Sequence, residues 1–390
     1  MAKVESRGLD RVEEIYQDRT QRVRELKAEG KQVIGYLHIY PVLEMLTALG
    51  LVPYSMFGDV REPITRADAA LPSIVCRFLR SLLDQGLKGK YGFLDGVVMA
   101  HMCEVGEKLA HVWPTYIDLP YNYFIDTPHT TQQAALKHHK EQLKAFKKSL
   151  EEFTGNELSP ERLKEAIKLH NEQRALVREL YDLKKQAPPL ISGTETIRVI
   201  MALMSLPIEE GTALLRQVIN DVEQGNNAPV KKPARLLVWG STMDTTALVE
   251  MIESTGANVV MDDILVGSRP YFADVELTDD PLDGLAHRYL VDLKYPRTFV
   301  APPVDSTKKV YLEDLENRFH YVKDYAEEWN ANGVVLETMR YCDVYGYDVP
   351  ALRDYLDNVG LPNTHIEWDY SEAALAPLRT RIQAFVEVVG

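Results

Sequence analysis

Apolar residues in the first 120 positions form short runs that alternate with stretches of helical spacing. The short runs predict strands at residues 32–39, 51–57, 91–102 and 115–119. Apolar residues spaced three or four apart predict helices at residues 40–49, 71–87 and 104–112. A charged stretch without Gly or Pro predicts an N-terminal helix over residues 9–30. Strands that alternate with helices indicate a parallel sheet with right-handed crossovers.

The pattern changes near residue 130, where charged, Gly-poor segments of helical spacing begin and continue to residue 226. A Gly-, Asn- and Pro-rich linker follows, and the alternation then resumes. The second series predicts strands at residues 235–239, 258–262, 333–338 and 364–367 and helices at residues 245–255, 321–330, 349–358 and 378–388. We therefore predict an α/β fold with two Rossmann- or flavodoxin-like parallel-sheet domains and a helical region between them. The predicted boundaries are 1–31 (N-terminal helix), 32–129 (first α/β domain), 130–226 (helical region) and 227–390 (second α/β domain).

Composition excludes several classes of function. The net charge of −14 argues against non-specific binding to nucleic acid and to anionic membrane surfaces. No apolar run approaches the roughly 18 residues of a membrane span, and the N-terminus does not have the pattern of a signal peptide. Three cysteines in 390 residues do not form a disulfide framework. We therefore expect a cytoplasmic protein that binds neither nucleic acid nor membrane.

Two segments resemble each other and both lead to a cysteine. Residues 96–103 read GVVMAHMC, and residues 333–342 read GVVLETMRYC. Each is predicted to be a buried strand that ends just before Cys103 or Cys342. The carboxyl ends of strands in open α/β sheets are where ligands usually bind. The two cysteines are therefore candidates for one shared site.

The three cysteines admit two interpretations. Cysteine is often buried, so Cys76, Cys103 and Cys342 could be inert core thiols. Alternatively, helices that begin after the two strands would stabilise thiolates at Cys103 and Cys342. Cys76, on a helix of the first unit, could then supply a third ligand to a [4Fe–4S] cluster with one iron left open. No C-x-x-C pair is present to indicate a zinc ribbon or a ferredoxin-type site.

Three further residues are candidates for proton transfer. His38 and His101 lie at predicted strand ends, and Glu44 lies in the first turns of a predicted helix near the same edge. Each also has an ordinary interpretation, as a hydrogen-bonded loop histidine or a surface glutamate. Residues 240–244, GSTMD, form a strand-to-helix turn without the lysine of a P-loop. We therefore predict no ATP site on this chain.

These residues together resemble the 2-hydroxyacyl-CoA dehydratase and benzoyl-CoA reductase family of iron–sulfur subunits. The resemblance extends from about residue 32 to the C-terminus. It rests on the order of short segments that include Pro41-Val-Leu-Glu44, Cys76, Cys103, Asp262-Asp263, Cys342-Asp343 and Gly360-Leu-Pro362. Residues 88–101, KGKYGFLDGVVMAH, are most similar to the smaller cluster-bearing subunit (C or gamma) of ATP-dependent benzoyl-CoA reductase.

The resemblance implies that Cys76, Cys103 and Cys342 bind one [4Fe–4S] cluster, with Glu44, His38 and His101 as candidate catalytic residues. It also implies a paralogous cluster-bearing subunit, a dimeric ATPase activator that carries the ATP, and ferredoxin as electron donor. The expected reaction is reduction of benzoyl-CoA to a cyclohexadiene-carbonyl-CoA in anaerobic aromatic degradation. Two alternatives remain open, namely a subunit of an (R)-2-hydroxyacyl-CoA dehydratase and an electron-transfer or scaffold subunit that does not contact substrate.

Overall fold

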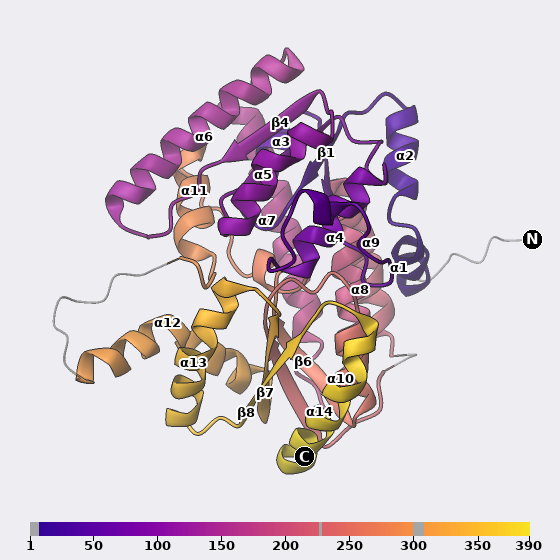
Figure 1. Ribbon diagram of the computed structural model, residues 1–390, viewed down its shortest axis with the longest axis vertical. Helices are drawn as coiled ribbons and strands as arrows, with labels where there is room; N and C mark the ends of the chain where they lie inside the picture. Colours follow the sequence, from indigo (N-terminus) through magenta and orange to yellow (C-terminus); the bar gives the residue numbers. More distant parts are fainter. Residues whose placement is uncertain (1–7, 226–227, 299–307) are drawn as a thin grey trace, which may run out of the picture.

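The computed structural model describes residues 8–225, 228–298 and 308–390, and within them it contains two four-stranded parallel sheets (Figure 1). The first sheet has the order β2-β1-β3-β4, with bounds β1 (Val33–Tyr36), β2 (Val52–Ser55), β3 (Gly96–Ala100) and β4 (Tyr121–Ile125). The second sheet has the order β6-β5-β7-β8, with bounds β5 (Ala234–Trp239), β6 (Ala257–Asp263), β7 (Gly333–Met339) and β8 (Asn363–Trp368). All neighbouring strands are parallel. The predicted α/β fold with two parallel-sheet domains is confirmed.

Both sheets follow the same chain path. In each sheet the second strand lies at the edge beside the first, and the third strand pairs with the opposite side of the first. Gly96 pairs with Ile34 of β1, and Gly333 pairs with Leu236 of β5, so the two Gly-Val-Val segments occupy equivalent positions. A side chain at Gly96 would collide with the backbone of Tyr121 on β4, where a Cβ would lie 2.7 Å from the carbonyl oxygen. The glycine thus permits close pairing of β3 with β4.

Helices surround and connect the sheets. Those of the first unit are α1 (Gly8–Gln17), α2 (Gln21–Ala28), α3 (Leu43–Ala48), α4 (Arg77–Leu87) and α5 (Glu104–Tyr116). The helical region contains α6 (Gln133–Thr154), α7 (Pro160–Asp182), α8 (Gly193–Leu203) and α9 (Ile208–Glu223). The second unit has α10 (Ala247–Ser254), α11 (Pro281–His287), α12 (Lys308–Glu328), α13 (Asp343–Asn358) and α14 (Leu375–Val389).

The segment after β6 crosses back to the first sheet's side of the molecule. Figure 1 shows α11 beside α6, far from the strands of the second sheet. Asn171 on α7 donates a hydrogen bond of 2.8 Å to the carbonyl oxygen of Val275, and its own side-chain oxygen accepts one of 2.9 Å from the Val275 N–H. A continuous apolar core also includes residues of both sheets. The two units are therefore interlocked.

Three sequence predictions about elements are wrong. The N-terminal helix is broken into α1 and α2, because the Asp18 carboxylate accepts hydrogen bonds from the backbone N–H and hydroxyl of Thr20. The helix expected at residues 71–87 begins only at Arg77. The strand expected at residues 115–119 is the end of α5 and the loop after it, and the real edge strand, β4, begins at Tyr121.

Within residues 8–225, 228–298 and 308–390, no helix is both long enough and apolar enough to cross a membrane.

Candidate functional site

Each of the three cysteines is the N-cap residue of a helix. Cys76 precedes α4, Cys103 precedes α5 and Cys342 precedes α13. Cys103 and Cys342 are each the third residue after a strand, following Ala100 of β3 and Met339 of β7. The Sγ of Cys103 accepts a hydrogen bond of 3.2 Å from the N–H of Gly106. Helix N-termini present free N–H groups and a partial positive charge, and both stabilise a thiolate.

The three thiols lie close enough to influence one another's ionisation. Burial raises the pKa of Cys76 to about 12, and the charge of Cys103 contributes to this increase. Burial, followed by the charge of Cys76, raises the pKa of Cys342 well above its ordinary value. The charge of Cys103 also raises the pKa of Cys342. One shared site for these two cysteines stays a prediction.

Aromatic rings adjoin the cysteines. The Tyr295 ring packs edge-on against His38, Tyr40 and Tyr345, with ring centroids 4.8, 5.6 and 5.9 Å apart. After burial and Tyr345, the charges of Cys103 and Cys342 contribute to the raised pKa of Tyr295. These rings form a largely apolar wall beside the thiols.

Two buried arginines lie near this wall. Arg269 donates a hydrogen bond of 2.8 Å to Asp263 and another to the hydroxyl of Tyr345. Arg297 donates one of 2.8 Å to the carbonyl oxygen of Thr127, while its Nε and Nη1 atoms have no hydrogen-bond partner within the described part of the chain. The charge of Arg297 also acts on the pKa of Cys103. A buried guanidinium with free N–H groups favours an anionic group beside it.

Sequence reasoning missed Tyr295, Tyr345, Arg269 and Arg297. The first and last belong to the loop KYPR at residues 294–297, which has no periodicity and no recognisable motif. Tyr345 lies within α13, where a helical tyrosine is most simply read as packing. These four residues come from separate segments of the chain, so no local sequence signal marks them as a group.

His38 lies in the loop after β1 with a positive φ of 76°, an uncommon conformation for a non-glycine residue. Burial and then the charges of Arg269 and Arg297 lower the pKa of this imidazole well below its ordinary value. Its Nδ1 has no hydrogen-bond partner among the described residues. His38 is therefore a neutral imidazole with one free nitrogen in the aromatic wall.

Glu44 is fully buried on α3 and does not lie at the surface. Its carboxylate accepts hydrogen bonds from Arg174 of α7 and, at 2.8 Å, from the hydroxyl of Tyr289. Burial alone would raise the pKa of Glu44, but Arg174, His170 and Arg288 outweigh it and hold the pKa well below the usual range. Glu44 is consequently a buried carboxylate that stays ionised.

A small cavity lies between the loop of His38 and the helices around Glu44. Its volume is about 70 Å³, and its lining includes His38, Thr47, His170, Arg174 and Tyr289. Sites for drug-sized ligands typically measure about 300–1,000 Å³, so this cavity holds water or a small group but not an acyl-CoA. A larger cavity, of about 660 Å³, lies between α6 and α11, and its lining includes none of the predicted site residues.

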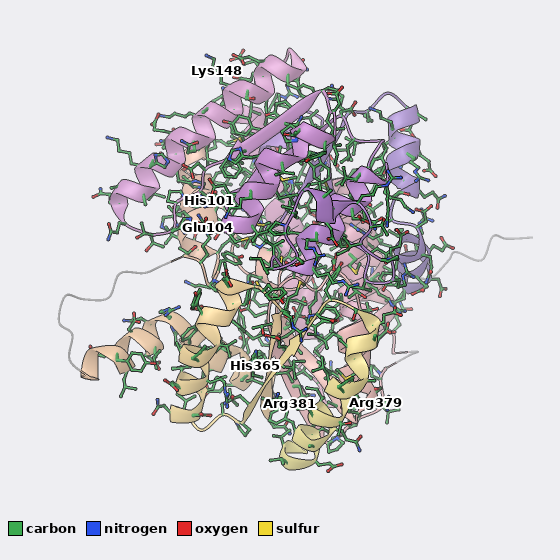
Figure 2. The ribbon with its side chains drawn as sticks, viewed as in Figure 1. His101, Glu104, Lys148, His365, Arg379 and Arg381 are labelled. Atoms are coloured by element: carbon green, nitrogen blue, oxygen red, sulfur yellow. The ribbon has the colours of Figure 1, made fainter. Side chains whose placement is uncertain are left out.

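His101 lies two residues before Cys103, but its ring contacts a polar group of side chains. Its Nδ1 is 3.1 Å from Asp126 Oδ1, and its Nε2 is 3.2 Å from His129 Nε2. Figure 2 shows His101 and Glu104 near the junction of the two units, whereas His365 lies in the second unit. The three predicted catalytic residues thus occupy three different surroundings.

The family is decided by a match that covers most of the chain. Residues 39–389 match the model of the family described as "2-hydroxyglutaryl-CoA dehydratase, D-component". The chain belongs to this family.

Known relatives include both dehydratases and a reductase. The (R)-phenyllactyl-CoA dehydratase beta subunit of Clostridium sporogenes is 24% identical over 368 residues, which cover 94% of each chain. A benzoyl-CoA reductase subunit from Thauera aromatica is 24% identical, and the match covers 92% of this chain and 91% of the relative. The beta subunit of (R)-2-hydroxyglutaryl-CoA dehydratase from Acidaminococcus fermentans is 25% identical, and the match covers 93% of each chain. These relatives are subunits of enzymes that act on acyl-CoA thioesters. Their sequence identities to this chain, 24–25%, are nearly equal.

The residues present fit the iron–sulfur cluster that the resemblance implies. Burial raises the pKa of Cys76 and of Cys342, and the charge of a neighbouring cysteine adds to the increase in each, so three thiolates together need a positively charged partner. Helix N-termini supply part of that charge, and a metal centre would supply the rest. Three thiolates also match the donor type of [4Fe–4S] clusters while leaving one position without a cysteine.

Proposed function

We propose that this protein is the cluster-bearing, non-ATPase subunit of an acyl-CoA-reducing enzyme of the benzoyl-CoA reductase type. The observation that carries the proposal is that Cys76, Cys103 and Cys342 each begin a helix, in helices supplied by both units, and that Cys76 and Cys103 both act on the pKa of Cys342. Free thiols of this kind suit a reducing compartment such as the cytoplasm. The likeness of residues 88–101 to the smaller reductase subunit favours the reductase over other reactions in the family.

Cys76, Cys103 and Cys342 would hold a [4Fe–4S] cluster, which when bound supplies electrons of low potential. The rings of Tyr40, Tyr295 and Tyr345 pack edge-on against one another and would exclude water beside the thiols. Among the described residues, Nε and Nη1 of the buried Arg297 guanidinium have no hydrogen-bond partner, and these N–H groups could bind an anion or a carbonyl oxygen.

The candidate acid and base residues differ in what they can do. Neutral His38, with Nδ1 free, can exchange a proton with a group beside the aromatic wall. Glu44 acts as a carboxylate that orders Arg174 and Tyr289 around the small cavity. His101 can pass a proton along its contacts with Asp126 and His129.

Beside His38, the described residues of this chain do not enclose a cavity large enough for an acyl-CoA. A cavity of about 70 Å³ beside His38 cannot enclose benzoyl-CoA or another acyl-CoA. We therefore propose that a paralogous cluster-bearing partner supplies the rest of the site. A dimeric ATPase activator, reduced by ferredoxin, would bind the ATP and deliver the electrons.

Metal analysis of anaerobically purified protein tests the cluster. We expect about four iron and four acid-labile sulfide per chain, because one cube contains four of each. Cys103→Ser should lose most of both while it stays folded, since serine is also a good N-cap residue for α5. Near-zero iron in the wild type, or unchanged iron and absorption spectra in Cys103→Ser, would refute the proposal.

The dehydratase function is the second candidate, because the matching family and two of the three relatives described above carry dehydratase names. ATP use separates the two reactions in the reconstituted complex with its partner subunits. A net reduction consumes electrons and ATP at every turnover, whereas a dehydratase recycles its electron and needs ATP only catalytically. A cluster spectrum that substrate never alters, while the partner's spectrum changes, would instead indicate an electron-transfer or scaffold subunit.

A further inference from the structure

A buried carboxylate joins the two units near the carboxyl ends of their strands. Asp244 lies in the turn between β5 and α10 of the second unit and is 6% exposed. Its Oδ2 accepts a hydrogen bond of 2.8 Å from the N–H of Gly58, in the loop that follows β2 of the first unit. The same oxygen accepts another of 2.8 Å from the hydroxyl of Tyr370, which follows β8. One oxygen atom therefore connects three loops that belong to both sheets.

The loop residue Tyr370 extends this connection to the start of α4. Its ring packs edge-on against Phe78, with ring centroids 5.9 Å apart. Phe78 lies in the first turn of α4, two residues after Cys76. Tyr370 is 1% exposed and has a φ of 55°, which is uncommon for a residue with a side chain. The hydrogen bond to Asp244 helps to hold this conformation, in which the ring packs on the turn next to Cys76.

The loop at Gly58 makes a second connection to α4. The N–H of Asp59 donates a hydrogen bond of 2.9 Å to Ser81 Oγ on α4, and the Ser81 hydroxyl donates one of 3.2 Å to the Asp59 carbonyl oxygen. A Cβ at Gly58 would lie 2.6 Å from the Tyr370 hydroxyl and 2.9 Å from Ser81 Oγ, so a side chain here would displace one of them. The loop, the tyrosine and α4 are therefore in close contact.

Only one oxygen of Asp244 takes part in these contacts. The Oδ1 atom is buried and has no hydrogen-bond partner among the described residues. Burial, the largest cause, raises the pKa of Asp244 to about 6. A neutral side chain with a carbonyl oxygen at the position of Oδ2 would accept both hydrogen bonds. The junction therefore uses Asp244 as an acceptor and does not depend on its charge.

We infer that Asp244 is a positioning residue, which holds α4 and its N-cap residue Cys76 against the unit that carries Cys342. This inference deepens the proposed function and rests on it, because the position of Cys76 serves a purpose if both cysteines bind one cluster. The two cysteines begin helices in different units. Groups that build a metal site must be held within about 0.5 Å of the required geometry, so the contact between the units has to be fixed.

Alkylation of Cys76 in the iron-free, full-length chain tests its position without a cluster. Cys76 is 8% exposed, so iodoacetamide reaches it when the contacts around α4 open. Asp244→Ala removes both hydrogen bonds and should speed the labelling of Cys76, measured by peptide mass spectrometry, at least about tenfold. Tyr370→Phe removes one hydroxyl and should speed it about fivefold, whereas Asp244→Asn should label as the wild type does.

Tyr181→Phe is the matched control. The Tyr181 hydroxyl donates a comparable buried hydrogen bond of 2.7 Å to Asp262, but this bond joins α7 to β6. Tyr181→Phe should lower the free energy of unfolding about as much as Tyr370→Phe does, yet leave the labelling of Cys76 unchanged.

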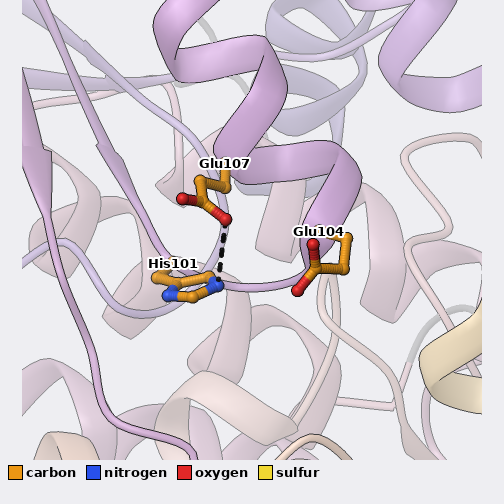
Figure 3. A group of neighbouring side chains, drawn as sticks. All are labelled: His101, Glu104 and Glu107. Atoms are coloured by element: carbon orange, nitrogen blue, oxygen red, sulfur yellow. Dashed lines mark ion pairs between the residues drawn. The ribbon is translucent and has the colours of Figure 1, made fainter.

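The start of α5 offers a second control. There His101 Nε2 lies 3.4 Å from Glu107 Oε2, beside Cys103 (Figure 3). Glu107→Gln weakens this contact at another cysteine-bearing helix and should also leave the labelling of Cys76 unchanged.

Iron analysis then links the position of Cys76 to the proposed cluster. After anaerobic reconstitution with iron and sulfide, Asp244→Ala should retain less than about half of the wild-type iron. Asp244→Asn and Tyr181→Phe should retain all of it.

Four results would overturn the positioning role. The first is labelling of Cys76 at the wild-type rate in Tyr370→Phe, which decides the matter even if Asp244→Ala does not fold. The second is equally fast labelling in Tyr181→Phe, and the third is labelling in Asp244→Asn as fast as in Asp244→Ala. The fourth is full iron retention in Asp244→Ala. Wild-type protein without iron would refute the cluster and leave the labelling rates as they are, so the two failures are distinguishable.

Discussion

A buried ion pair fixes the position of Glu44 at the residue scale. Glu44→Gln leaves the guanidinium of Arg174 buried without its counter-charge. Loss of one partner from a buried pair typically costs about 3–5 kcal/mol, so we expect the free energy of unfolding to fall by about 3 kcal/mol. Urea unfolding at neutral pH measures the change.

An exposed pair provides the control for Glu44. Arg11 and Glu14 are 2.7 Å apart with side chains 43% and 59% exposed, so Glu14→Gln should cost less than about 1 kcal/mol. The pKa of Glu44 is lowered in the folded state, so its stabilisation is present above the unfolded pKa of about 4.3 and is lost as the pH falls further. An effect of Glu44→Gln that is no larger than that of Glu14→Gln would contradict the burial of this charge.

Glu337 has the opposite pH dependence. It is fully buried on β7, where it accepts hydrogen bonds of 2.7 Å from the Ser241 N–H and 2.6 Å from Trp368 Nε1, and burial raises its pKa to about 7. Between the unfolded pKa of about 4.3 and pH 7 the folded state binds more protons, so stability falls as the pH rises. Glu337→Gln should remove this pH-dependent loss. The free energy of unfolding of the wild type, minus that of the variant, should therefore fall by up to about 3 kcal/mol between pH 4 and pH 8. A difference that stays constant over that range would show that Glu337 does not titrate there.

The sequence predicted individual residues well where a local pattern marked them. Cys103 and Cys342 follow strands, as the Gly-Val-Val segments predict. The partners of Glu44 could not be predicted, because Arg174 is 130 residues away and Tyr289 is 245 residues away along the chain. Long-range pairs of this kind carry no periodic signal in a single sequence.

At the scale of elements, Gly333 controls how β7 packs against α14. A Cβ at this position would lie 2.8 Å from the ring of Phe385, closer than real Cβ contacts. Gly333→Ala should therefore destabilise the fold by about 1–3 kcal/mol, as overpacking usually does. Thermal or urea unfolding of the purified variant checks this value.

Gly346 is the matched control, because it lies inside α13 and its Cβ would meet no heavy atom within 4 Å. Gly346→Ala should stabilise the protein by up to about 1 kcal/mol through the higher helix propensity of alanine. If the two variants changed stability in the same direction, the packing explanation for Gly333 would be wrong.

Element boundaries were the weaker part of the sequence prediction, for identifiable reasons. Residues 115–119 have the apolar pattern of a strand, yet α5 includes Pro114 and ends at Tyr116. This error hid the loop that carries Asp126 and His129, both of which contact His101. Residues 71–87 kept helical spacing, but the helix begins after Cys76, so the position of that thiol at a helix N-terminus was not visible.

At the scale of the whole molecule, the cysteines belong to different units. Cys76 and Cys103 begin helices beside the first sheet, and Cys342 begins a helix beside the second. The sequence predicted two similar α/β units, and both sheets do have the same strand order. It did not predict that residues 271–289 cross back to pack near α7, because such crossing depends on contacts such as that of Tyr289 with Glu44.

A ligand shared between interlocked units should stabilise the whole chain at once. If the proposed cluster binds all three thiolates, reconstitution with iron and sulfide should raise the Tm of the single unfolding transition by about 5 °C or more. Cys342→Ser removes only the ligand from the second unit and should lose most of that increase, whereas His320→Gln, at an exposed position of α12, should keep it. Differential scanning calorimetry under anaerobic conditions measures both. A full increase in Cys342→Ser would mean that the first unit binds the metal alone, and the convergence of the two units would then have another cause.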